Sequence, residues 1–146
     1  MPCFPQNTHK AIALVKSGTD TSSLAIEMSY DNKAQIFINL KKYEEAIKCA
    51  DMALENNPKD LSAYFFKGRS FDKQGKYEEA IKCYDKALEI DPKCFNAWYN
   101  KAANLYELGK IKEALQCIEE CILLNPNDQD AKEKKKLLLE KLNISN

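Results

Sequence analysis

Residues 61–94 read LSAYFFKGRSFDKQGKYEEAIKCYDKALEIDPKC, and the predicted fold follows from this pattern. The same spacing of residue types appears one period earlier, in 27–60, and one period later, in 95–128. A pattern that returns at a constant period indicates a stack of equivalent structural units. The recurring positions hold an aromatic ring (Tyr30, Tyr64, Trp98), a small residue (Ala34, Gly68, Ala102), an alanine (Ala46, Ala80, Ala114) and a proline (Pro58, Pro92, Pro126).

Each unit is expected to form two antiparallel helices. In the central unit, Tyr64, Gly68 and Phe71 lie on one stripe of a first helix. Gly75 then allows a left-handed closing residue, and a second helix follows with its apolar stripe at Tyr77, Ala80, Ile81, Tyr84, Ala87 and Leu88. Pro92 disfavours helical backbone at the residue before it and so ends the second helix. Such a pair cannot bury its apolar faces without its neighbours.

These units resemble tetratricopeptide repeats (TPRs). The family's W-x2-L-G-x2-Y slot is carried here as YDNKAQIF, YFFKGRSF and WYNKAANL. The later slots read YEEAIKCADMALENNP, YEEAIKCYDKALEIDP and IKEALQCIEECILLNP. The resemblance covers residues 27–128, about 70% of the chain. It implies an all-α protein, a right-handed α-solenoid of three helix-turn-helix units at 27–60, 61–94 and 95–128.

The ends of the chain depart from the repeat. Residues 1–21 are predicted to be an irregular arm with one short helix, HKAIALVK, which either packs loosely as a cap or serves as a docking or dimerisation arm. The repeat domain is expected over 22–142, with its first helix capped near Ser22 or Ser23. Residues 129–142 are predicted to be a capping helix with Ala131, Leu138 and Leu142 toward the stack, and 143–146 a tail.

Composition excludes several classes of protein. The formal net charge is zero, and Arg69 is the only arginine among 22 basic residues, which argues against a nucleic-acid partner. No apolar run is long enough to cross a bilayer, and the apolar patch 11–15 is too short for a secretory signal. We therefore expect a soluble cytoplasmic protein that needs no membrane and no cofactor.

Cysteines recur at Cys49, Cys83 and Cys117, one in each unit. Equivalent positions of packed helix pairs are about 10 Å apart, which is too far for a disulfide. The sequence favours free, partly buried thiols in a reducing compartment. Cys117 and Cys121 share a helix face, but no histidine or further cysteine pair supports a metal site. Cys3 and Cys94 are likewise expected to be free.

No catalytic arrangement appears in the sequence. It has no nucleophile elbow, no glycine-rich phosphate loop and no HExxH motif. Its acidic residues stand in charged pairs on outward helix faces, where ion pairs imply nothing catalytic. An enzyme is the least favoured interpretation.

The concave face of the solenoid is the predicted binding site. In a TPR stack the first helix of each unit lines this face. Amides can donate to and accept from a peptide backbone, and aromatic rings can hold apolar side chains. The predicted groove residues are Asn32, Gln35, Asn39, Phe65, Phe66, Arg69, Lys73, Asn96, Tyr99, Asn100 and Asn104. Asparagine is also common in this family, so the repeat type is an alternative explanation for Asn32, Asn100 and Asn104. At least one of Phe65 and Phe66 is expected to be exposed in an empty groove.

Comparison with the family also argues against one kind of partner, the acidic C-terminal tails of heat-shock chaperones. TPR co-chaperones that bind the acidic C-terminal tails of heat-shock chaperones use lysine, arginine and asparagine at five groove positions. This chain has Asp31, Gln35, Phe66, Asn96 and Asn100 there. Every cation is missing, and Asp31 would repel a carboxylate, so no carboxylate clamp is expected. Arg69 and Lys73 remain able to hold one acidic residue of a ligand.

The sequence therefore predicts a protein–protein interaction module, expected to be a monomer, that binds a peptide or helical segment of an unidentified partner in the groove. Two alternatives stay open. The first is a secretion-type chaperone that dimerises through its N-terminal arm. The second is a structural module that self-associates through its repeat ends.

Overall fold

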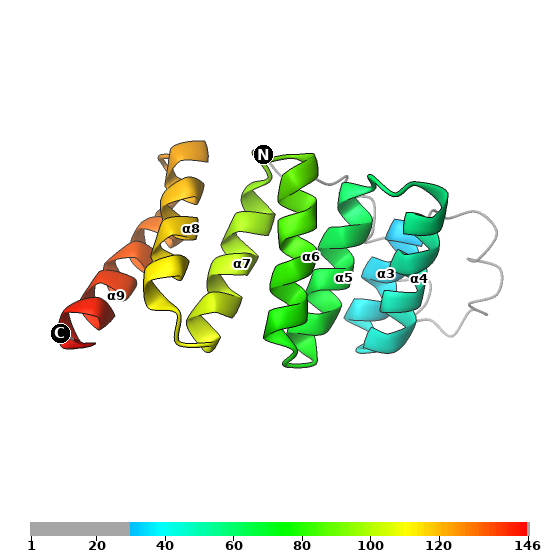
Figure 1. Cartoon of the computed structure of the whole chain (residues 1–146), viewed down its shortest axis with the longest axis horizontal. Helices are drawn as coiled ribbons and strands as arrows, with labels where there is room; N and C mark the ends of the chain where they lie inside the picture. The colour runs from blue at the N-terminus through cyan, green and yellow to red at the C-terminus, as the bar shows by residue number, and fades with distance from the viewer. Residues whose placement is uncertain (1–29, 146) are drawn as a thin grey trace.

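The computed structural model describes residues 30–145, and these form a single row of α-helices without strands (Figure 1). The helices are α3 (Tyr30–Asn39), α4 (Tyr43–Asn56), α5 (Leu61–Lys73), α6 (Tyr77–Ile90), α7 (Phe95–Glu107), α8 (Ile111–Leu124) and α9 (Gln129–Ser145). The predicted all-α solenoid is confirmed. The predicted tail is wrong, because α9 continues to Ser145. The predicted N-terminal arm, Cys3 and the start of the first helix lie outside the described residues.

Within each unit the two helices pack closely because one partner is small. A Cβ atom added to Gly68 of α5 would lie 2.8 Å from the ring of Tyr84 on α6. Tyr84 is fully buried, so its ring fills the space that the glycine leaves. The equivalent positions hold Ala102 and Ile118 in the third unit. In the second and third units a larger second-helix side chain is thus matched by a smaller first-helix residue, whereas the first unit has Ala34 and Ala50 at these positions.

The turn inside each unit has the same backbone conformation. Gly75 and Gly109 both have φ of 75°, and Lys41, at the equivalent place in the first unit, has φ of 61°. The next residue closes each turn: the N–H of Lys76, for example, donates to the carbonyl of Phe71 at 2.9 Å. Lys41 therefore adopts a left-handed conformation that side chains other than glycine rarely tolerate.

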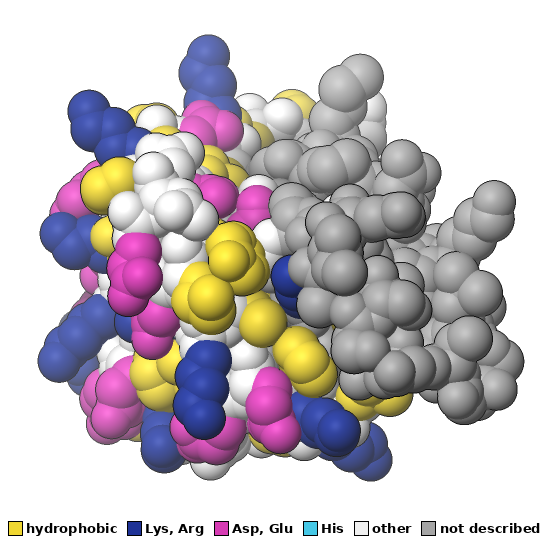
Figure 2. All heavy atoms as spheres, turned by 90° about the vertical axis from the view of Figure 1, so that its right-hand side faces the viewer, with side chains coloured by type: hydrophobic (Ala, Val, Ile, Leu, Met, Phe, Trp, Pro, Cys, Tyr) yellow, Lys and Arg dark blue, Asp and Glu magenta, His cyan; other side chains and the backbone are white. Residues whose placement is uncertain are grey.

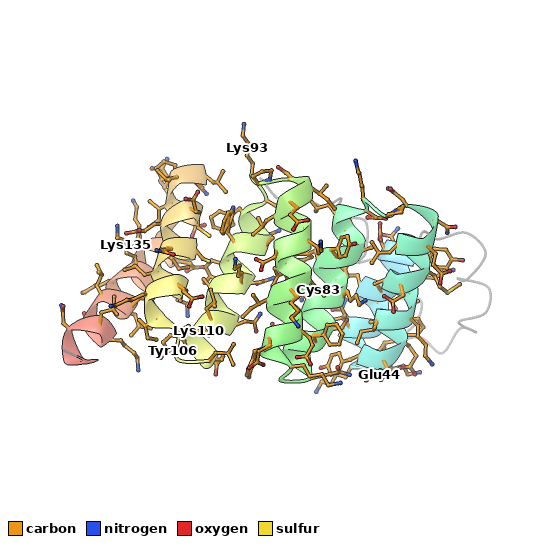
Figure 3. All side chains as sticks on the ribbon, viewed as in Figure 1. Glu44, Cys83, Lys93, Tyr106, Lys110 and Lys135 are labelled. Carbon is orange, nitrogen blue, oxygen red and sulfur yellow. The ribbon has the colours of Figure 1, made fainter. Side chains whose placement is uncertain are left out.

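Ion pairs join each unit to the next at equivalent positions of the repeat. Lys67 on α5 lies 2.7 Å from Asp51 on α4, and Lys135 on α9 lies 3.3 Å from Glu119 on α8. Lys101 and Asp85 make the corresponding pair between α7 and α6. Figure 3 labels Lys135, whose side chain lies where α9 passes α8. These bridges have half-exposed carboxylates, so each contributes at most about 1 kcal/mol.

The first helices of the units form the inner side of the row. Neighbouring first helices contact each other, α3 with α5 and, less extensively, α5 with α7, whereas the second helices do not approach one another in this way. Elements that are closer together lie on the side of smaller radius, so α3, α5 and α7 line the inner face. The helix α9 packs on α8 but makes little contact with α7.

The terminal helix α9 closes the apolar end of the stack. Its Ala131 and Leu138 are buried against the preceding unit. Lys132, Lys134 and Lys136 are exposed on its other sides. At the opposite end, viewed in Figure 2, acidic and basic side chains are interspersed over the described surface. None of the described helices is both long and apolar enough to cross a membrane.

Candidate functional site

The two phenylalanines expected to face the groove are in the core instead. Phe65 and Phe66 are only 4% and 7% exposed, so the prediction that at least one is exposed is wrong. Their rings meet edge to face with centroids 5.6 Å apart, and Phe65 also meets the Tyr84 ring at 5.9 Å. The middle helix α5 is flanked by α3 and α7 as well as by α6. Residues on adjacent faces of such a helix are both buried, which a prediction based on one helix pair leaves out.

The prediction that Asn104 faces the groove is also wrong. Its position in the repeat is equivalent to Ile36 and Ser70, and all three residues are buried. The amide Nδ2 of Asn104 donates to the carbonyl of Asn100 at 3.0 Å, just as the Ser70 hydroxyl donates to the carbonyl of Phe66 at 2.8 Å. The inward position of the third unit is occupied by Ala103, which is exposed.

A polar centre lies where α3 and α5 meet on the inner face. Arg69 Nη1 donates to Gln35 Oε1 at 3.0 Å, and Gln35 in turn donates to Asn39 Oδ1 at 3.1 Å. The guanidinium carbon of Arg69 lies 6.0 Å from the centre of the Phe65 ring. These contacts engage one side of the guanidinium, and its other N–H groups remain able to donate to a ligand.

Two titratable groups near this centre resist ionisation. Burial raises the pKa of Asp72, against the opposing effect of Lys73 and Arg69. Burial also raises the pKa of the Tyr84 phenol, whose hydroxyl has no hydrogen-bond partner within the described part of the chain. Asn100 on α7 is half-buried beside this group. The arrangement offers an arginine and an amide to a ligand's backbone or acidic side chain.

Two carboxyl groups come together at the first-unit end of the inner face. Burial, and then the neighbouring Asp60 carboxylate, raise the pKa of Asp31 to about 6. Asp60 is itself held as the N-cap of α5, where its Oδ1 accepts from the N–H of Ala63 at 3.1 Å. Asp31 Oδ1 is buried and accepts no hydrogen bond from residues 30–145. At neutral pH this end of the groove therefore carries negative charge.

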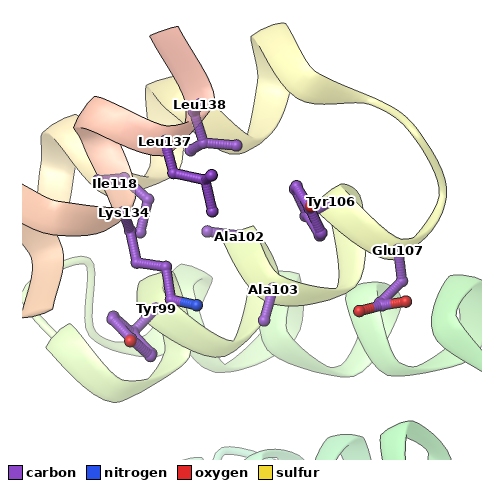
Figure 4. Close-up of a pocket in the computed structure, with 9 residues that line it drawn as sticks. All are labelled: Tyr99, Ala102, Ala103, Tyr106, Glu107, Ile118, Lys134, Leu137 and Leu138. Atoms are coloured by element: carbon purple, nitrogen blue, oxygen red, sulfur yellow. The ribbon is translucent and has the colours of Figure 1, made fainter. Parts of the chain in front are cut away.

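A pocket opens between α7 and α9 on the inner face (Figure 4). Its volume is about 130 Å³, and it exists because these two helices hardly contact each other. Ile118 of α8 contributes to its wall. The lining residues are Tyr99, Ala102, Ala103, Tyr106, Glu107, Ile118, Lys134, Leu137 and Leu138.

The two charged residues of this pocket stand at opposite ends of it. In Figure 4 the Lys134 side chain extends beside Tyr99, and Glu107 lies beyond Tyr106. Both are exposed, and neither pairs with an opposite charge among residues 30–145. The predicted groove residues include Tyr99 but not Lys134 or Leu137, because the sequence places both in a capping helix outside the groove. The sequence feature that could have indicated the pocket is Ala103, a small residue at an inward-facing position of the repeat.

Other groups of reactive side chains do not form a second site. Burial raises the pKa values of Cys83 and Cys117 to about 11 and that of Cys121 to about 12. These thiols are protonated at neutral pH and are poor nucleophiles. Cys49, Cys83, Cys117 and Cys121 are free thiols, and residues 30–145 have no cluster of metal-ligand side chains.

The geometry agrees with comparisons to known proteins. The model of the family described as "Anaphase-promoting complex, cyclosome, subunit 3" matches residues 39–121, more than half of the chain. This chain belongs to that TPR family. No curated protein matches the sequence.

Solved TPR domains have the same fold. The second TPR domain of human RPAP3, in complex with the HSP70 peptide SGPTIEEVD, is 26% identical with a TM-score of 0.71, covering 75% of this chain and 92% of that one. The first TPR domain of Spaghetti (RPAP3), bound to the HSP90 peptide SRMEEVD, is 20% identical with a TM-score of 0.74, covering 77% and 90%. The Sgt2 TPR domain of Aspergillus fumigatus is 19% identical with a TM-score of 0.74, covering 80% and 78%.

The remaining predicted groove residues of this TPR chain stay accessible. Asn32, Asn96 and Asn100 are half-buried, while Asn39 and Lys73 are exposed. The inner face therefore combines the polar centre at Arg69 with the open pocket at Tyr99. The aromatic floor predicted at Phe65 and Phe66 is part of the core that supports it.

Proposed function

We propose that this TPR chain is a protein-interaction module that binds a peptide segment of a partner along its inner face and has no catalytic role. The observation that carries the proposal is Arg69, which donates a hydrogen bond to Gln35 across the α3–α5 contact, together with the half-buried Asn100 on the inner helix α7. Together, a guanidinium and an amide can hydrogen-bond to peptide carbonyl and N–H groups. The pocket beside Tyr99 supplies an apolar contact farther along the same face.

We further propose that the chain does not bind a C-terminal carboxylate. The TPR domains of RPAP3 are bound to peptides that end in EEVD. Binding such an end requires cations in the groove, and this chain has Asp31, Phe66 and Asn96 at positions where clamp-type domains use polar or cationic residues. Two observations support this proposal: Phe66 is buried, and Asp31 is anionic above pH 6.

The first experiment compares a free C-terminus with a blocked one. Fluorescein-labelled SRMEEVD and SGPTIEEVD, each as the free acid and as the C-terminal amide, are titrated with the protein and followed by fluorescence polarisation. We expect the acid and amide forms to differ by less than about threefold in Kd, which is less than about 1 kcal/mol. An affinity about 100-fold lower for the amide than for the acid would instead indicate a carboxylate clamp.

The second experiment locates the binding face. Peptides are selected from a phage-displayed random library, and their affinities are measured for the wild type and for Arg69→Ala and Asn100→Ala. We expect each substitution to weaken the selected peptides about tenfold, because it removes a charged or polar partner. Lys82→Ala, an exposed residue on α6, is the matched control and should change nothing. Equal binding by all four proteins would refute the proposed groove.

A further inference from the structure

We infer that the pocket between α7 and α9 holds one leucine- or methionine-sized side chain of a partner peptide, flanked by an acidic residue at Lys134 and a basic residue at Glu107. This inference deepens the proposed function and rests on it. It assigns the chemistry of the segment that occupies the third-unit end of the inner face.

The volume of the pocket suits one side chain of the partner peptide. Its volume of about 130 Å³ is close to the roughly 150 Å³ of an apolar cavity that accepts benzene in another protein. A branched or linear side chain of four heavy atoms fits this space. Alanine would leave most of it empty.

The pocket's lining gives the chemistry of the anchor. Ala102, Ile118, Leu137 and Leu138 present only aliphatic groups, and Tyr99 and Tyr106 present rings. Leu137 remains 38% exposed, although Leu138 beside it is 3% exposed. Covering this apolar surface favours binding by about 25 cal/mol per Å² removed from water.

The flanking charges give the charge pattern of the partner. Lys134 and Glu107 lie at opposite ends of the pocket, and neither is neutralised by an opposite charge among the described residues. A segment with an acidic residue, an aliphatic residue and a basic residue complements both ends. A segment with two like charges meets one repulsive end.

The test uses blocked pentapeptides and NMR. The probes are acetylated, amidated GELKG, GEAKG, GELEG and GKLKG, added to isotope-labelled protein up to about 10 mM, since we expect such short peptides to bind with Kd near about 1 mM. We expect GELKG to shift the amide signals of Tyr99, Ala103 and Leu137. GEAKG should bind about tenfold or more weakly, because three carbon atoms are lost from the contact. Equal shifts with GELKG and GEAKG, or no shifts, would overturn the inference.

Substitutions inside and outside the pocket distinguish binding in the pocket from nonspecific binding. Ala103→Leu fills the pocket from an exposed position and should abolish the shifts, whereas Lys112→Leu on the exposed face of α8 should not. The wild type should prefer GELKG to the other probes, whereas Lys134→Glu, which makes both ends of the pocket acidic, should prefer GKLKG. An unchanged preference would contradict the role of Lys134.

The same variants distinguish this inference from the proposed function. If library-selected peptides depend on Arg69 and Asn100 but bind Ala103→Leu normally, the groove function stands and the pocket inference fails. If the substitutions at Arg69, Asn100 and Ala103 all leave the affinities of the selected peptides unchanged, the proposed function itself fails.

Discussion

At the scale of single residues, the first unit carries two local penalties that the other units avoid. Lys41 adopts the left-handed backbone for which the equivalent turns use Gly75 and Gly109. Asp31 keeps a carboxyl group half-buried beside the capping carboxylate of Asp60. Both penalties follow from side chains that do not suit the positions where the repeat places them. Both predict substitutions that increase stability.

Replacing Lys41 by glycine should stabilise the protein. The left-handed conformation costs an ordinary residue about 1–2 kcal/mol, and the greater freedom of glycine in the unfolded chain removes part of that gain. We expect the free energy of unfolding to rise by about 0.5–1 kcal/mol, measured by urea denaturation. Lys48 is an exposed residue inside α4, and Lys48→Gly should lower the free energy of unfolding. A loss of stability in Lys41→Gly would contradict the strain.

Asp31 should make stability fall as the pH rises. Its pKa is about 6 in the folded protein and 3.8 for an unperturbed carboxyl, so the folded state binds the proton more tightly. The resulting stabilisation is complete below pH 3.8 and is lost as the pH passes 6. Asp31→Asn should therefore be more stable than the wild type by a margin that grows from about pH 4 to about pH 7. Because the group is half-exposed, we expect that margin to stay below about 1 kcal/mol.

Urea denaturation across this pH range measures the effect of Asp31. Asp60→Asn provides the control, because asparagine still caps α5 while the repulsion of Asp31 is removed. An NMR titration of the Asp31 carboxyl in that variant should give a lower pKa. A margin that is constant with pH would contradict the raised pKa.

At the scale of helix pairs, the contact between the two helices of a unit depends on complementary volumes. Gly68 faces the Tyr84 ring, and the third unit has Ala102 and Ile118 at the same two positions. The family pattern tolerates both solutions because the summed volume, and not each residue alone, fills the space. The two positions are therefore expected to be energetically coupled.

A swap between units tests this coupling. Gly68→Ala places a methyl group against the Tyr84 ring and should destabilise the protein by about 1–3 kcal/mol. Tyr84→Ile alone leaves a cavity and should also cost about 2–4 kcal/mol. The double variant reproduces the third unit, so its loss should be smaller than the sum of the single losses by at least about 1 kcal/mol. Additive losses in urea denaturation would argue against complementary packing.

At the scale of the whole molecule, the stack is held by contacts between neighbouring elements. Each unit is joined to the next by buried small residues and by an ion pair, and α9 covers the end. In such an array a local defect affects nearby units most. The arrangement also explains where the pocket lies, because α9 packs against α8 and leaves its side toward α7 open.

Leu138 should secure the C-terminal end of the stack. It is 3% exposed, and Leu138→Ala should cost about 2–4 kcal/mol. Hydrogen exchange should accelerate in α8 and α9 before it does so in α5 and α6. The neighbouring Leu139, 42% exposed, is the matched control, and Leu139→Ala should change stability by less than about 0.5 kcal/mol. Uniform acceleration across all helices would show a single cooperative unit instead.

The helix pairs and their order could be predicted from the amino-acid pattern, and the resemblance to TPR proteins added which helices face inward. This was possible because the repeat period and the spacing of small and aromatic residues are set by the geometry within one unit. The same pattern predicted Arg69, Asn100 and Tyr99 as inner-face residues, and each is accessible in the structure.

Which inner-face residues are open could be learned only from the packing of one unit on the next. Phe65 and Phe66 are buried because α5 has neighbours on both flanks, and Asn104 is buried at the repeat position that also buries Ile36 and Ser70. The pocket at Tyr99 depends on the separation of α7 and α9, and the raised pKa of Asp31 depends on burial and on its distance from Asp60. Such separations are set in three dimensions, and a period along the chain carries no information about them.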